Sequence, residues 1–148
     1  MNLYRYYNGG VFELHITTPQ LEPTDRYNGS RRIYRLTERF CIRITYPGGS
    51  FNVTIPKGFE TDFASFPLIL QLILGNRDDY LEESILHDWL YREGIPVFFS
   101  NAAMRIVMTQ LRRPAWKRWC VFYGLMFLGT RAPGWQIIAH LWQKRKVN

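Results

Sequence analysis

The sequence has few cysteines, and their positions exclude several kinds of site. Its two cysteines, Cys41 and Cys120, lie far apart and match no metal-binding or redox spacing. We therefore expect two buried thiols in a reducing compartment, and no disulfide framework or cysteine-ligated zinc. The first residues, from Met1 to Tyr6, do not combine a basic start with an apolar run, so we expect no secretory signal.

Long hydrophobic runs are also absent. The apolar stretch 119–128 is only ten residues long and is followed by Gly129, Arg131 and Pro133, whereas a spanning helix needs about 20 residues. We expect a core helix here and no transmembrane segment. An alternative is a peripheral membrane face made by tryptophans interleaved with Arg and Lys, namely Trp116, Trp119, Trp135 and Trp142.

Acidic residues are missing from the last third of the chain. All 12 Asp and Glu lie within residues 1–93, whereas residues 94–148 carry nine Lys or Arg. This basic half predicts an acidic partner, such as nucleic acid, anionic lipid or an acidic protein surface. The alternative is a solvated basic face that only aids solubility, since no recognised nucleic-acid motif accompanies the charge.

The residues that are present predict one α+β domain over residues 1–148, of which 47% are apolar. Strand-like stretches occupy 11–16, 32–36, 40–46 and 51–55, with Pro19 and Pro23 ending the first of them. Asn28-Gly29 and Pro47 to Ser50 are typical of turns. We expect residues 1–57 to be mainly β, with a small antiparallel sheet over roughly 11–55.

Residues 58–67 form a motif loop, and residues 68–148 are predicted to be mainly α, with the helical half over roughly 66–145. We expect a short helix at 68–74, a second capped by Asp78 or Asp79 that ends near Glu93, and a third capped by Ser100 or Asn101 that ends near Arg113. Two further helices are expected at 116–128 and 136–144.

Two segments hold most of the residues that can do chemistry. Residues 58–67 read Gly-Phe-Glu-Thr-Asp-Phe-Ala-Ser-Phe-Pro, and residues 87–91 read His-Asp-Trp-Leu-Tyr. On a helical wheel the apolar residues Leu81, Ile85 and Leu86 share one half with Trp89 and Leu90, whereas Tyr80, Ser84, His87 and Tyr91 stack on the other side. We therefore predict that His87 points away from the core face.

If the motif loop folds over this helix, Asp62, His87 and Asp88 bring together two carboxylates and an imidazole. Such a set suits a divalent cation, or a water activated by His87 as a base. Thr61, Ser65 and Tyr91 are the candidate binding residues beside them. Ser65 lacks the nucleophile-elbow pattern. In the alternative, Asp62 caps the helix that begins near Phe66, and the His-Asp pair is structural.

The two motifs together resemble the family of small phage and prophage proteins described as domain of unknown function 1353. The resemblance covers roughly residues 40–135 and rests on the segments 53–67 and 87–91. Family members often continue with an acid that opens the next helix, where this chain has Asn101. Asn101 could orient His87 by accepting a hydrogen bond, but it would stabilise an imidazolium less well than an acid.

The resemblance implies a phage or prophage origin, other phage proteins as partners, and a place in the host cytoplasm during infection or within the virion. It implies no particular activity. We expect a structural or accessory protein associated with the virion or tail. The alternative is a small metal-assisted hydrolase using His87, Asp62 and Asp88. The deciding geometry is whether His87 and Asp62 line an open cleft or lie sealed inside.

Overall fold

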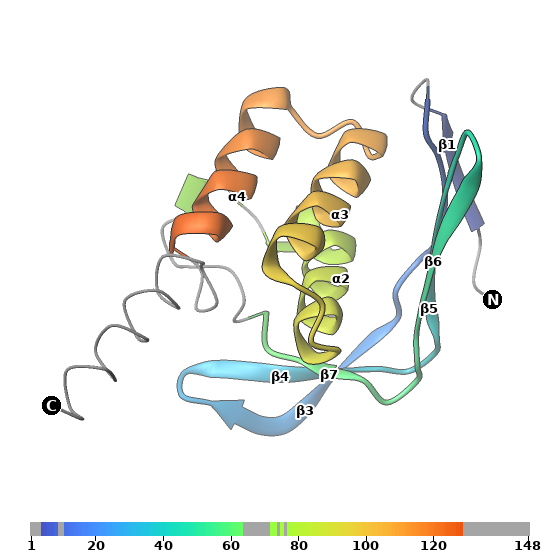
Figure 1. Cartoon of the computed structure of the whole chain (residues 1–148). Coiled ribbons are helices and arrows are strands. Elements are labelled where there is room, and N and C mark those ends of the chain that lie inside the picture. The colour runs from blue at the N-terminus through green and yellow to red at the C-terminus, as the bar shows by residue number, and fades with distance from the viewer. Residues whose placement is uncertain (1–3, 9–10, 64–71, 74, 76, 129–148) are drawn as a thin grey trace, which may run out of the picture.

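The computed structural model describes residues 4–8, 11–63, 72, 73, 75 and 77–128. The β-rich part comes first, followed by the helices, which confirms the predicted α+β class. In Figure 1 a four-stranded sheet stands along one side of helices α2 and α3, a three-stranded sheet lies below them, and α4 covers the opposite side. The helices expected at 68–74 and 136–144 lie outside the described residues, either wholly or in large part.

The four-stranded sheet is antiparallel with the order β1-β2-β5-β6. Its strands are β1 (Tyr4–Asn8), β2 (Glu13–Thr17), β5 (Phe40–Tyr46) and β6 (Gly49–Ile55). The predicted turn joins β5 to β6 through Pro47 and Gly48, and Gly48 has φ +96°. Proline followed by a residue at positive φ is typical of a type II turn. Strand β1 was not predicted from the sequence.

The three-stranded sheet has the order β3-β4-β7, with β3 (Leu21–Asn28), β4 (Arg31–Leu36) and β7 (Glu60–Thr61). The first predicted strand does end before Pro19, but β3 was not predicted, and it continues through Pro23. Proline is tolerated there because β3 is an edge strand, and the register of the β3–β4 pair shifts between Pro23 and Tyr27. The predicted turn at Asn28-Gly29 does connect β3 to β4.

Three α-helices follow: α2 (Leu81–Arg92), α3 (Val97–Gln110) and α4 (Ala115–Leu128). A 3₁₀ turn, η1 (Arg77–Tyr80), precedes α2, so the aspartates at 78 and 79 do not cap it as predicted. The predicted cap of α3 is also wrong: the helix begins directly after Pro96. Proline supplies a suitable φ and needs no hydrogen-bond acceptor at a helix start, so the helix gains a turn before Ser100. None of the described helices has both the length and the apolar character needed to cross a bilayer.

Two clusters of buried side chains hold these elements together. The larger one joins both sheets to α2 and includes Leu14, Ile42, Ile55, Ile85 and Leu86. The smaller one packs α3 against α4 below η1, through Tyr80, Met104, Met108, Val121 and Leu125. As a result α2 is covered on nearly all sides, and its buried residues include Glu82, Glu83, His87 and Asp88.

Candidate functional site

The motif loop alternates between the inside and the outside of the protein. Phe59, Thr61 and Phe63 are buried, whereas Glu60 and Asp62 are partly exposed. This is the alternation that a strand produces, and β7 pairs with β4 over Glu60 and Thr61. Consequently neighbouring motif residues contact different parts of the protein.

The inward side chains fasten the loop to α2. The ring of Phe59 meets Trp89 edge-on with 5.3 Å between centroids, and the Arg92 guanidinium lies 4.7 Å from the centre of the Phe59 ring. Thr61 donates its hydroxyl hydrogen to the Asp88 carboxylate. The same Thr61 oxygen accepts a hydrogen bond from the backbone N–H of Phe63 at 3.1 Å.

The outward side chains bind the loop to the three-stranded sheet. Glu60 accepts hydrogen bonds from Arg26 and from Arg35, and these bonds lower the pKa of its carboxyl group. Asp62 accepts a hydrogen bond of 2.8 Å from the side-chain amide of Asn28. The loop therefore links the β3–β4 hairpin on one side to α2 on the other.

His87 is sealed inside the protein. Its side chain is 0% exposed, and its Nδ1 atom is buried as well. As predicted, His87 lies apart from the apolar cluster that contains Ile85, Leu86 and Leu90. The second side of α2 is covered too, however, so the side chain is buried and does not reach the surface. The His87 ring lies 4.2 Å from the Tyr91 ring, and its Nε2 lies 2.9 Å from the side-chain oxygen of Asn101 on α3.

The contact with Asn101 fixes the tautomer of His87, and burial decides its charge. An amide oxygen only accepts hydrogen bonds, so Nε2 carries the proton and donates it. Burial disfavours the charged imidazolium and lowers the pKa of His87 from 6.5 to about 4, although the bond to Asn101 opposes this change. At neutral pH the ring is an uncharged hydrogen-bond donor that joins α2 to α3.

The hydrogen bonds of the predicted site residues run to different partners within the described part of the chain. Asp88 is bonded to Thr61 and His87 to Asn101, whereas Asp62 is partly exposed and bonded to Asn28. Among the residues that the structure describes, no three His, Cys, Asp or Glu side chains gather closely enough to hold a metal ion. Ser65, the remaining candidate, lies outside the described residues.

A buried ion pair lies at the start of α2. Arg113, between α3 and α4, donates through Nε to Glu83 at 2.7 Å, and the Glu83 side chain is 1% exposed. Burial raises the pKa of Glu83, while the Arg113 guanidinium opposes that change. Sequence patterning had not singled out this pair, because its partners are 30 residues apart.

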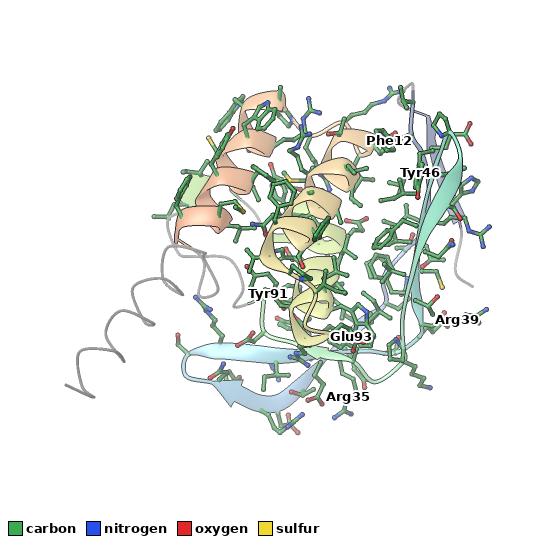
Figure 2. The ribbon with its side chains drawn as sticks, viewed as in Figure 1. Phe12, Arg35, Arg39, Tyr46, Tyr91 and Glu93 are labelled. Carbon is green, nitrogen blue, oxygen red and sulfur yellow. The ribbon has the colours of Figure 1, made fainter. Side chains whose placement is uncertain are left out.

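An open cavity does exist, but it lies elsewhere. It has a volume of about 230 Å³ and lies between the four-stranded sheet and α3. Figure 2 shows Phe12 and Tyr46 at this side of the sheet, and both line the cavity together with Ile95, Phe99 and Ile106. Its lining is apolar and includes none of the predicted site residues, so it offers no acid or base.

The exposure of the two thiols differs from the prediction. Cys41 on β5 is half-buried, but Cys120 on α4 is exposed, so the expectation of two buried thiols is wrong for Cys120. Both are free. Cys120 lies on the helix whose outer face carries several exposed aromatic rings, which explains why it is not covered.

Comparison with known proteins relates this chain to one family. No curated protein and no solved structure matches this chain. A family model does match, over residues 34–125, and this span holds the motif loop, all of α2 and α3 and most of α4. The chain therefore belongs to the family described as Protein of unknown function (DUF1353).

Proposed function

We propose that this chain is a structural or accessory protein of a phage or prophage, in which the two motifs build the fold and the basic half docks on an acidic partner. The observation that carries the proposal is the complete burial of His87 with its Nε2 bonded to Asn101. A general base must reach both solvent and substrate. A sealed, neutral imidazole with a low pKa does neither.

The contacts of the motif loop support the same role. From Phe59 to Asp62 its side chains point in turn to α2 and to the β3–β4 hairpin, and each of these four makes a contact that fixes the loop. Buried polar contacts of this kind specify how elements pack, without any turnover. Attachment to a virion or tail fits a small protein in which the motif loop, α2 and the β3–β4 hairpin are held together and the second half is basic.

The alternative is a small metal-assisted hydrolase using His87, Asp62 and Asp88. It requires these three side chains to face one water-filled site. The described hydrogen bonds of Asp62 and Asp88 run to Asn28 and Thr61, which favours the structural role over this alternative.

The test is a melting experiment on His87→Ala. If the residue is structural, the variant loses about 1–3 kcal/mol through its unsatisfied partner and the empty space left behind. Wild-type Tm then stays the same on addition of calcium, zinc or magnesium. A variant with wild-type stability, combined with an ion-dependent rise of the wild-type Tm that the variant lacks, would support the hydrolase instead.

His15 supplies a control for the loss of a histidine. His15 lies on β2 and is half-buried, and no predicted function attaches to it. His15→Ala should change stability less than His87→Ala does, and it should not alter any response to ions.

A further inference from the structure

One face of α4 carries a ladder of exposed aromatic rings. Trp116, Trp119, Tyr123 and Phe127 follow one another at spacings of three and four residues, so they project from one side of the helix. Trp119 stacks on Tyr123 with an interplanar angle of 21°, and Tyr123 stacks on Phe127 with an angle of 12°. Phe127 at the far end is 68% exposed and Trp116 at the near end is 57% exposed.

The start of α3 extends this surface. Phe98 and Phe99 are 55% and 64% exposed, and Phe98 contacts Phe122 of α4 with 6.2 Å between ring centroids. We call Phe98, Phe99, Trp116, Trp119, Tyr123 and Phe127 together the aromatic face. Large apolar side chains gathered on one surface, each about half or more exposed, mark an interaction site.

Positive charge is concentrated at one end of the aromatic face. Lys117 lies 5.5 Å from the centre of the Trp116 ring, and Arg105 of α3 lies 4.3 Å from that of Trp119. Arg118 follows Lys117 directly in the sequence, and Arg112 lies between α3 and α4. Residues 119–128 contain no charged side chain at all, so the face passes from basic to aromatic to purely apolar along the helix.

This gradient matches the depth profile of a membrane interface. Cations belong at the lipid phosphates, Trp and Tyr at the level of the headgroups, and Phe beside the acyl chains. Single-stranded nucleic acid would present a phosphate with every stacked base, so cations would have to accompany the whole ladder. A second copy of the chain would bring the same charge, formally +7, to the contact.

We propose that the aromatic face docks on an anionic lipid bilayer, with α4 inclined so that its basic start lies at the phosphates and its apolar end lies deeper. The inference rests on the proposed docking role of the basic half and names the partner. Phe127 reaches the acyl boundary and Tyr123 lies among the headgroups, while Lys117, Arg105 and Arg112 contact lipid phosphates. At 14 residues, α4 is too short to cross the bilayer.

The experiment measures binding of the full chain to vesicles of phosphatidylcholine, with and without one third phosphatidylglycerol. We expect sedimentation with the anionic vesicles and a blue shift of tryptophan fluorescence, both weakened by salt. Tyr123→Ser and Phe127→Ser should each lower the affinity about tenfold. Lys117→Gln and Arg112→Gln should each lower it about fivefold.

Matched variants elsewhere serve as controls. Tyr27 on β3 is 58% exposed, close to the 52% of Tyr123, so Tyr27→Ser makes the same change on another surface. Lys57→Gln removes an exposed charge from the sheet half. Both controls should bind the anionic vesicles like the wild type, and an equal loss in Tyr27→Ser would overturn the assignment of the face.

A second arm replaces the vesicles with oligo(dT). Binding to the oligonucleotide without binding to vesicles refutes the membrane inference but keeps the basic docking role. Binding to neither refutes the membrane inference and leaves an acidic protein surface as the partner of the basic half. Equal binding to neutral and anionic vesicles, or self-association through the aromatic face that abolishes vesicle binding, also overturns the inference.

Discussion

Replacing Thr61 with valine tests how the motif loop is fastened. Valine has nearly the shape of threonine but lacks the hydroxyl, which in the wild type donates to Asp88 and accepts from the Phe63 N–H. Thr61 is 0% exposed and Asp88 is 7% exposed, so water cannot replace the lost bonds. The change leaves a carboxylate short of a donor and a backbone N–H short of an acceptor.

The expected cost is about 2–4 kcal/mol, because a hydrogen bond to a charged group contributes about 1.5–3 and an ordinary one about 1. For a chain of this size that corresponds to a fall in Tm of roughly 8–15 °C. Urea unfolding followed by circular dichroism measures the free energy directly, and the dependence on urea should keep its wild-type slope, since the buried surface is unchanged.

A matched control and a double-mutant cycle complete the design. Thr54 on β6 is exposed, so Thr54→Val should stay within about 0.5 kcal/mol of the wild type. Thr61→Val and Asp88→Asn should be coupled by at least about 1 kcal/mol, as expected for side chains in contact. If Thr61→Val behaves like Thr54→Val and shows no coupling to Asp88→Asn, the Thr61–Asp88 hydrogen bond does not fasten the motif loop to α2.

Two ionic contacts give further predictions. Arg113→Met strands the buried carboxylate of Glu83 and should cost about 3–5 kcal/mol at pH 7. Because burial raises the pKa of Glu83, its neutral form is favoured in the folded protein, so this deficit should shrink as the pH falls and grow as it rises. A deficit independent of pH would refute the role of Glu83. Glu60→Gln should lower the free energy of unfolding at neutral pH, because hydrogen bonds from Arg26 and Arg35 lower the pKa of Glu60 and so favour the folded state when the carboxylate is charged. This difference between variant and wild type should disappear as the pH falls below the ordinary pKa of 4.5. Equal dependence of stability on pH in the two proteins would contradict the prediction.

Much of the architecture follows from local patterns. Alternating residues in 40–46 and 51–55 and the Pro-Gly turn between them define the β5–β6 hairpin. Strand β3 was hidden by Pro23, because a proline tolerated only at a sheet edge reads as a break when the sheet is unknown. The short β7 depends on pairing with β4, a contact that no local pattern records.

The candidate site was harder to predict, because the chemistry open to His87 and Asp88 depends on whether they are buried. The motifs correctly indicated a loop that meets the His87 helix, but the joining residue is Thr61, through Asp88. A helical wheel assumes that the polar side of a helix faces water. In α2 that side is covered, and its polar groups are satisfied by residues distant in sequence, such as Asn101 and Arg113.

The central claim is that His87 is a sealed, neutral structural group, and an NMR titration of its imidazole tests this most directly. The chain has three histidines, and the spectrum of His87→Gln identifies the His87 signal by its loss. Since burial lowers the pKa of His87 to about 4, its ring signal should not move between pH 8 and about pH 5 and should not respond to zinc. A signal that titrates near 6.5, or that shifts when zinc is added, would contradict the account.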